Sequence, residues 1–170
     1  MKGKNFSDWT SVLRRDLIAA MNAAAIPFTP PNNTSKIKVH LAVFVQPYLE
    51  WILVGTKTIE SRFSMRRVAP YDAVCPGDLV VLKLSGGCVV GVCRAAKVQL
   101  FELNADTYDY IRTNYSVPLC AENAAFWRTR AKCRYATLIH LTDVHRVRQF
   151  ACGKRDRRGW VAVPSPYEGD

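Results

Sequence analysis

Two apolar segments joined by a Ser-Gly-Gly turn most constrain how this chain can fold. Residues 79–84 and 88–98 are rich in valine and leucine, and Ser85-Gly86-Gly87 separates them. Glycines at a short turn between two apolar runs are typical of a β-hairpin. Pro76-Gly77-Asp78 forms a further turn signal directly before the first run. The chain is therefore predicted to contain a β-sheet with this hairpin in it.

Further strands and short helices are predicted on both sides of the hairpin. Hydrophobic spacing and turn residues predict strands at 38–45, 57–62, 135–147 and 160–163, and helices at 7–24, 104–114 and 121–130. Another short helix is predicted to begin at Pro47 and end at Gly55, because proline suits a first helical turn and glycine a helix end. Five or six strands with short helices between them predict an α+β fold, a small mixed sheet or barrel.

The chain is expected to form one principal domain. Its 170 residues suffice for a single hydrophobic core. We predict an N-terminal helical extension with a proline-rich linker at 1–36, the domain at 37–164 and a C-terminal tail at 165–170. No apolar run approaches the roughly 20 residues that cross a bilayer. The N-terminus does not resemble a secretory signal, so a cytoplasmic location without membrane contact is expected.

The cysteines and histidines predict no metal or cofactor site. The six cysteines include no CxxC pair, and metal-ligand spacing is absent. We expect them to be buried and reduced, although nothing in the sequence excludes a single catalytic cysteine. His40 and His140 fall in apolar runs, where a hydrogen-bonded structural role is expected.

Positive charge is concentrated near the C-terminus. The formal net charge is +10, and ten lysines and arginines between positions 128 and 158 stand against two aspartates. Arginine matches phosphate geometry, so a polyanion partner is predicted. We call residues 152–160 the arginine loop. Its predicted phosphate contacts are Lys154, Arg155, Arg157 and Arg158, with Trp160 as either a core residue or a stacking platform. Alternatively, Asp156 pairs with Arg157 or Arg158 and merely orders the loop.

A run of mixed charges at 55–62, Gly-Thr-Lys-Thr-Ile-Glu-Ser-Arg, marks a candidate site. In an extended strand, Glu60 and Arg62 share one face and Lys57 takes the other. All three reach one cleft only if Lys57 lies in the turn before the strand. Glu60 then accepts hydrogen bonds from a base amino group and Arg62 donates a pair. Lys57 anchors a phosphate or acts as a base. The alternative is a structural Glu60–Arg62 salt bridge.

The pattern Gly55-x-Lys57-Thr58-x-Glu60-x-Arg62 resembles the ASCH domain, a member of the PUA-like superfamily that is related to EVE and YTH domains. The helix before it and the turn and hairpin after it fit the same resemblance, which covers roughly residues 38–163. The resemblance implies a PUA-like β-barrel with a cleft that binds RNA or a nucleobase. Some ASCH proteins are amidohydrolases acting on acetylated cytidine, and others have been described as ribonucleases.

Two functions follow, and the sequence alone does not decide whether the chain is an enzyme. The first is an RNA- or nucleic-acid-binding module that recognises a base, modified or not, with Tyr48, Lys57, Glu60, Arg62 and Ser85 as contacts. The second is a hydrolase on a modified nucleoside or RNA, with Lys57, Thr58 and Glu60 as catalytic residues. Glu60 stands where the amidohydrolases carry a catalytic threonine, and Glu102 and Asp106 are only loose matches to their glutamate. This departure favours binding of a nucleic acid or a nucleoside-like molecule.

Overall fold

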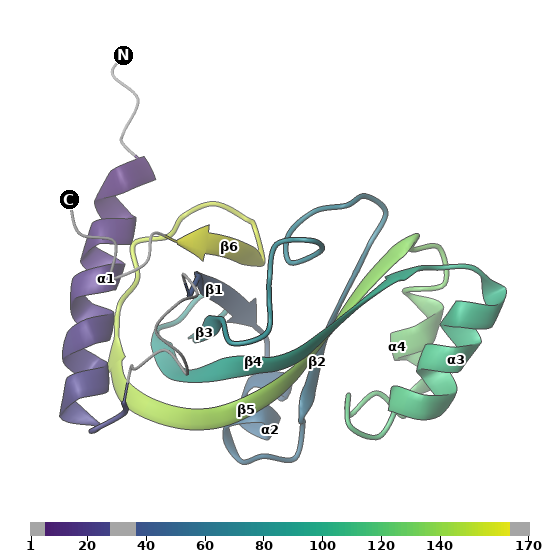
Figure 1. Ribbon diagram of the computed structural model, residues 1–170, viewed down its shortest axis with the longest axis horizontal. Coiled ribbons are helices and arrows are strands. Elements are labelled where there is room, and N and C mark those ends of the chain that lie inside the picture. Colours follow the sequence, from purple (N-terminus) through teal and green to yellow (C-terminus); the bar gives the residue numbers. More distant parts are fainter. Residues whose placement is uncertain (1–5, 28–36, 164–170) are drawn as a thin grey trace.

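The computed structural model describes residues 6–27 and 37–163 as a mixed α+β fold (Figure 1). The predicted linker falls mostly outside these residues, and the tail at 165–170 falls wholly outside them. The elements in chain order are α1 (Phe6–Ala23), β1 (Val39–Phe44), α2 (Tyr48–Leu53), β2 (Ile59–Ser64), β3 (Leu79–Leu84), β4 (Val89–Glu102), α3 (Ala105–Tyr115), α4 (Ala124–Arg128), β5 (Tyr135–Phe150) and β6 (Trp160–Val163).

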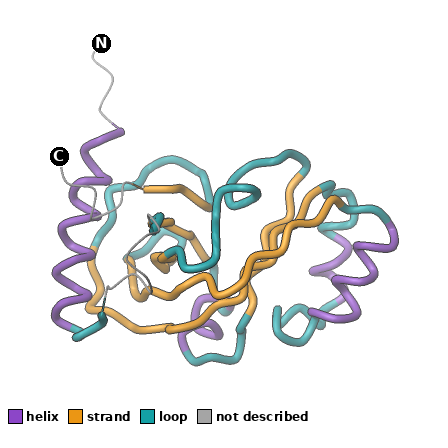
Figure 2. The backbone as a smooth tube through the Cα atoms, viewed as in Figure 1, coloured by secondary structure: helices purple, strands orange, loops and turns teal. Residues whose placement is uncertain are grey.

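The six strands form one curled sheet, a half-barrel, in the order β2-β5-β4-β3-β1-β6. The strands β1 and β3 run parallel, and every other neighbouring pair is antiparallel. Figure 2 shows the strands winding into a curl at the end nearest α1 and running out as an extended ribbon towards α3 and α4. The edges of the sheet are β2 and β6. We call the gap between these two edges the seam.

The predicted hairpin is confirmed. The strands β3 and β4 pair through the turn at Ser85-Gly86-Gly87, where Gly87 N donates to Leu84 O at 3.0 Å. Further along β4, a Cβ on Gly91 would lie 2.8 Å from the carbonyl oxygen of His145 and 2.8 Å from Leu53 Cδ2. Glycine at this position therefore lets β5 and α2 approach β4 closely.

Three hydrophobic clusters hold the elements together. The helix α1 packs Leu13, Leu17 and Met21 against β1, β3 and β5. A second cluster joins α2 to β1, β3, β4 and β5 and includes Trp160. In the third, Ile111 of α3 and Trp127 of α4 pack on the outer part of β2 and β5. The helices α3 and α4 thus cover the extended end of the ribbon, away from α1 (Figure 1).

The structure corrects several predicted boundaries. Strand β2 begins at Ile59 rather than at Lys57, and helix α4 spans only Ala124–Arg128. Strand β4 is longer than predicted because its pairing with β5 continues to Glu102, opposite Tyr135, and β5 is longer because it continues to Phe150, opposite Val89. Asn104 caps α3 as predicted, since its side chain accepts a hydrogen bond from Thr107 N.

Candidate functional site

The three charged residues of the sequence motif meet in one buried cluster. The carboxylate of Glu60 accepts a hydrogen bond from Arg62 Nε at 2.7 Å and lies 3.4 Å from Lys57 Nζ. The side chains of Lys57 and Glu60 are only 3% and 8% exposed. Because β2 begins at Ile59, Lys57 lies in the turn before the strand. The alternation of side chains along a strand therefore does not apply to Lys57, which can lie on the same side as Glu60. One carboxylate therefore sits between two cations, as its burial requires.

Lys57 is fully engaged by the protein. Its ammonium donates to Ile59 O at 2.6 Å and to Leu119 O at 3.1 Å, and its third hydrogen faces Glu60. Burial lowers the pKa of Lys57, and the charge of Glu60 opposes that shift. An ammonium has three donors, so none is left for a phosphate. The phosphate-anchor role of Lys57 stays a prediction that would require one of these contacts to break. In this structure the lysine orients Glu60 and ties the α3–α4 connection to β2.

Arg62 closes the seam of the half-barrel. Besides Glu60, its guanidinium donates to Gly159 O at 3.2 Å and to Val43 O at 3.0 Å. Gly159 directly precedes β6 and Val43 belongs to β1, so one side chain on β2 reaches the strands at the opposite edge. The guanidinium also lies 5.4 Å from the centre of the Trp160 ring. The Glu60–Arg62 salt bridge is thus present, as the structural alternative predicts, but within a larger cluster.

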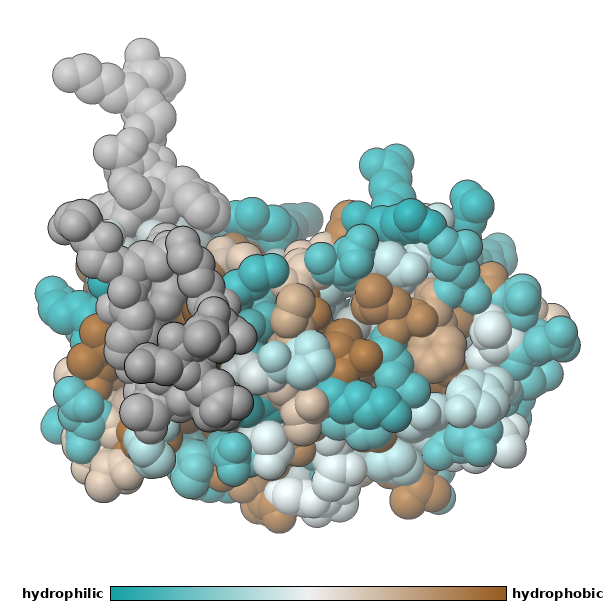
Figure 3. All heavy atoms as spheres, in the orientation of Figure 1, coloured by the Kyte–Doolittle hydropathy of each residue, from teal (hydrophilic) through white to brown (hydrophobic). Residues whose placement is uncertain are grey.

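A cavity of about 250 Å³ opens beside this cluster. We call it the motif pocket. The residues that line it are Val43, Phe44, Val45, Tyr48, Lys57, Glu60, Ser61, Arg62, Phe126 and Arg130. Three cations and one carboxylate make the lining positive overall, and three aromatic rings supply apolar walls. Figure 3 shows one face of the molecule, on which hydrophilic side chains surround a smaller group of hydrophobic ones.

The backbone of the edge strand adds hydrogen-bonding groups to the motif pocket. The carbonyl of Thr58 accepts from Leu141 N of β5, whereas the carbonyl of Ile59 turns away towards Lys57. In antiparallel pairing the backbone groups of alternate residues face away from the partner strand. Ser61 therefore directs its N–H and C=O away from β5, at the edge where it lines the pocket. Such groups can pair with the edge of a planar ligand.

The arrangement of strands and helices matches solved structures of an ASCH protein from Zymomonas mobilis. A variant of that protein with a tyrosine-to-phenylalanine substitution aligns over 76% of this chain and 92% of its own, with a TM-score of 0.61 and 13% identity. The chain has an ASCH-domain fold. The unsubstituted protein aligns over 75% of this chain and 88% of its own, with a TM-score of 0.60 and 13% identity. No family model and no curated protein matches the sequence.

The sequence analysis did not predict two residues of the motif pocket, Phe126 and Arg130, as binding groups. Arg130 stacks on Phe126, with its guanidinium carbon 3.5 Å from the ring centre, and donates to Phe126 O at 2.8 Å. Burial lowers the pKa of Arg130. The spacing of four residues between an aromatic residue and an arginine near a helix end was the available signal. What the sequence could not indicate is that this helix end faces β2.

Of the other motif and hairpin candidates, Tyr48 lines the motif pocket and the rest lie outside it. The Trp51 ring packs edge-on against Tyr48, at 5.5 Å between ring centres. Thr58 and Ser85 are exposed and are not among the lining residues. Neither is Glu102, which is exposed and pairs with Arg67. Asp106 occupies the first turn of α3. Thr58 and Lys57 are therefore adjacent in sequence, but the structure does not place both side chains in one site.

The arginine loop is ordered by its aspartate. The carboxylate of Asp156 accepts from Lys154 Nζ at 2.9 Å and from Arg158 Nε at 3.0 Å. The hydrogen bond from Arg158 holds the pKa of Asp156 well below its ordinary value. The Lys154 side chain is 3% exposed, so its predicted contact with a phosphate is not supported. Arg155 and Arg157 are exposed and remain open to a ligand.

Trp160 is a core residue. Its side chain belongs to the cluster beneath α2 and is 4% exposed. The ring faces Arg62 and His40 rather than solvent. Of the two predicted roles for Trp160, the stacking platform is therefore wrong, because an exposed base cannot reach the face of a buried ring.

Both structural histidines are hydrogen-bonded, as predicted. His40 Nε2 lies 2.9 Å from Asp78 Oδ2, and His140 Nε2 lies 2.8 Å from Gln99 Oε1. Burial raises the pKa of Asp78, but hydrogen bonds from His40 and from two backbone amides outweigh it and keep that pKa below its ordinary value.

The six cysteines are unpaired, but only Cys93 is buried, which corrects the expectation that all are. Burial raises the pKa of the Cys93 thiol. Within residues 6–27 and 37–163 no cluster of three metal-ligating side chains occurs. None of the helices described there is long and apolar enough to cross a bilayer.

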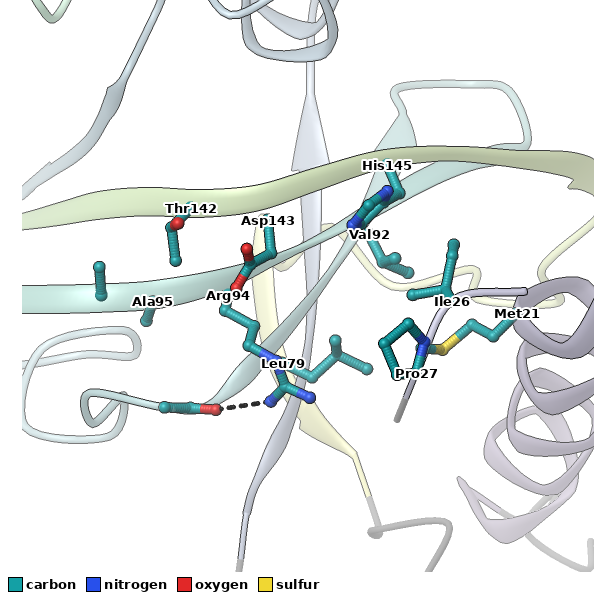
Figure 4. Close-up of a pocket in the computed structure, with 12 residues that line it drawn as sticks. Met21, Ile26, Pro27, Leu79, Val92, Arg94, Ala95, Thr142, Asp143 and His145 are labelled. Atoms are coloured by element: carbon teal, nitrogen blue, oxygen red, sulfur yellow. Dashed lines mark hydrogen bonds between the residues drawn. The ribbon is translucent and has the colours of Figure 1, made fainter. Parts of the chain in front are cut away.

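A larger cavity of about 440 Å³ lies between the end of α1 and strands β3, β4 and β5. Figure 4 shows Met21, Ile26 and Pro27 on one side of it and Arg94, Asp143 and His145 on the other. Arg94 donates to Gly77 O at 3.1 Å. None of the predicted site residues lines this cavity, so its size alone does not make it the functional site.

Proposed function

We propose that this protein is a nucleic-acid-binding module, with RNA as the expected partner, that recognises a single base in the motif pocket. The observation that carries the proposal is the buried Glu60 carboxylate, fixed between Lys57 and Arg62 and facing a cavity with aromatic walls. A carboxylate accepts hydrogen bonds from an exocyclic amino group, and aromatic rings stack on a base face.

The size and charge of the motif pocket support a base-sized ligand. Its volume of about 250 Å³ lies just below the roughly 300–1,000 Å³ of pockets for drug-sized molecules. Tyr48 and Phe126 supply ring faces, and Ser61 supplies backbone groups for the base edge. The stacked guanidinium of Arg130 adds positive charge, which favours a ligand that carries a phosphate.

The arginine loop supports contact with a polynucleotide rather than with a free base alone. Arg155 and Arg157 are exposed, while Asp156 fixes the loop around them. Phosphate contacts of this kind position a nucleic acid without reading its sequence. The division of labour is that the loop contributes affinity and Glu60 contributes selectivity.

The test is a binding assay with short single-stranded RNAs that differ in one base. In fluorescence anisotropy at fixed salt, Glu60→Gln should weaken binding of the preferred base about tenfold and reduce discrimination between bases. Thr142→Ala, at an exposed position outside the motif pocket, is the control and should change nothing. Mass spectrometry of ligand retained from a panel of modified nucleosides identifies the base. An unchanged base preference in Glu60→Gln would refute the proposal.

One observation favours hydrolysis of a modified nucleoside as a second candidate. Lys57 is buried beside Glu60 with a lowered pKa, as a catalytic lysine often is. Against it, the hydrogens of Lys57 are engaged by two carbonyls and Glu60, so the ammonium has none with which to polarise a substrate carbonyl. Incubation with N-acetylated cytidine, followed by mass spectrometry, decides between them. Turnover that is lost in Lys57→Met would favour the hydrolase.

A further inference from the structure

A second, smaller cavity adjoins the motif pocket at Arg62. It has a volume of about 120 Å³, and its lining includes Arg62, Thr137, Gly159 and Trp160. Residues 68–70, between β2 and β3, add apolar groups to the lining. We call it the seam cavity because Arg62 and Gly159 come from the two edges of the half-barrel. Arg62 lines both cavities, so a ligand group in either one can contact the same guanidinium.

The seam cavity is lined by two buried residues whose polar atoms have no partner. In the described part of the chain, three buried side-chain atoms have no hydrogen-bond partner, and Thr137 Oγ1 and Trp160 Nε1 are two of them. Thr137 and Trp160 are 1% and 4% exposed. Native proteins rarely leave such atoms unpaired, and a water, an ion or a ligand group in the cavity would satisfy them.

Thr137 and the ring of Trp160 both lie beside Arg62. Arg62 and Thr137 are directly opposite each other in the β2–β5 pairing, so their side chains share one face of the sheet. The Trp160 ring lies 5.4 Å from the guanidinium carbon. A Cβ on Gly159 would lie only 2.9 Å from Arg62 Nη1. Glycine there keeps the guanidinium in its present position between the two cavities.

The available groups are mostly hydrogen-bond donors. An indole N–H donates only, and a threonine hydroxyl donates or accepts. Of the five N–H groups of Arg62, three are engaged by Glu60, Gly159 and Val43 within the described contacts. Two N–H groups remain. Among the described residues, no carboxylate lines the seam cavity. A donor-rich, positively charged cavity without an anion complements phosphate oxygens.

We propose that the seam cavity is a phosphate subsite, which holds the phosphate of the nucleotide whose base occupies the motif pocket. The inference rests on the proposed base recognition and extends it from a base to a nucleotide. Arg62 binds the Glu60 carboxylate on one side and the ligand phosphate on the other. The hydroxyl of Thr137 and the indole N–H of Trp160 donate to the phosphate oxygens.

The first test follows the indole N–H of Trp160 by ¹⁵N NMR during addition of inorganic phosphate. The Trp160 resonance, assigned with Trp160→Phe, should move saturably, with chloride at equal ionic strength as a control. The indole N–H of Trp127 donates to Ala121 O, so its resonance is the internal reference and should stay in place. A Trp160 resonance that does not respond to phosphate overturns the subsite.

The second test compares a nucleoside with its 5′-monophosphate in wild type and Thr137→Val. Valine keeps the shape of threonine but lacks the hydroxyl. The substitution should weaken monophosphate binding about tenfold and leave nucleoside binding unchanged. It should not lower the stability of the free protein, since it removes an unpaired buried hydroxyl. Thr142→Val, at an exposed position on the same strand, is the matched control.

The outcomes separate this inference from the proposed function. If Thr137→Val leaves the ratio of monophosphate to nucleoside affinity unchanged, the subsite is overturned and the base pocket stands. If neither molecule binds and Glu60→Gln has no effect on RNA binding, base recognition and the subsite are both overturned. A loss of monophosphate affinity alone supports the subsite.

Discussion

Two regions of the molecule contain the same set of charges, one carboxylate between a lysine and an arginine. In the motif pocket Glu60 lies between Lys57 and Arg62, and in the arginine loop Asp156 lies between Lys154 and Arg158. The Glu60 side chain is 8% exposed and that of Asp156 is 35% exposed. The two clusters contain the same kinds of charged group, but their carboxylates differ in exposure to solvent.

Burial decides what each cluster does. In the pocket, the cations also bind backbone carbonyls from β1, β2, the connection after α3 and the residue before β6. The buried cluster therefore fixes tertiary structure and presents one rigid acceptor to a ligand. In the loop, the contacts join residues two apart in sequence. The Lys154 side chain is buried, but those of Asp156 and Arg158 are 35% and 53% exposed, so water screens their ion pair. The exposed cluster only shapes the loop that carries Arg155 and Arg157.

The largest expected effect comes from removing the buried carboxylate. Glu60→Ala leaves Lys57 and Arg62 without their shared anion in a poorly solvated site. We expect the free energy of unfolding to fall by about 3–5 kcal/mol, measured by urea denaturation. Asp156→Ala is the matched variant in the loop and should cost less than about 1 kcal/mol. Equal losses in the two variants would show that burial does not distinguish the clusters.

Replacing the arginine of each cluster by lysine sharpens the same comparison. In Arg62→Lys, one ammonium cannot reach Glu60, Val43 and Gly159 together. The side chain at position 62 then no longer joins β2 to the opposite edge of the sheet. A loss of about 2 kcal/mol in unfolding free energy is expected. Arg158→Lys should stay within about 0.5 kcal/mol of wild type. Thermal unfolding of both variants measures the difference, and a neutral Arg62→Lys would contradict the assigned role.

The loop should affect binding and leave stability unchanged. For Arg155→Ala and Arg157→Ala, we expect weaker RNA binding. The slope of the logarithm of the binding constant against the logarithm of salt concentration should become shallower by about one for each lost phosphate contact. The free energy of unfolding should change by less than about 0.5 kcal/mol. Lys97→Ala, another exposed cation, is the control. Unaltered affinity and salt slope in both arginine variants would remove the loop from the interface.

The smallest effect concerns pH. The hydrogen bond from Arg158 holds the pKa of Asp156 below its ordinary value of 3.8. A carboxyl group with a depressed folded-state pKa contributes stability above its unfolded pKa, and this contribution is lost as pH falls through the folded-state pKa. The stability difference between wild type and Asp156→Asn should therefore be greatest near neutral pH and vanish in acid. Urea denaturation of both proteins at several pH values measures this difference. A stability difference that grows as pH falls would contradict the prediction.

The sequence identified the elements better than it identified their ends. The Ser85-Gly86-Gly87 turn, the Asn104 cap and the 160–163 strand are local features, and each occurs where it was predicted. The start of β2 was misplaced by two residues because Lys57 is held by Trp51 O and Leu119 O, which are tertiary partners. Strand alternation alone placed Lys57 on the wrong face.

The sequence by itself determined the residues of the motif, their charges and the ASCH-like order of helix, motif and hairpin. Only the tertiary structure decided which of them share a site. It brought Arg130 and Phe126 to the motif, engaged Lys57 with carbonyls distant in sequence, and placed Trp160 in the core. The physical reason is that a charge acts through its distance to partners and its exposure to water, and both are set by how the sheet curls.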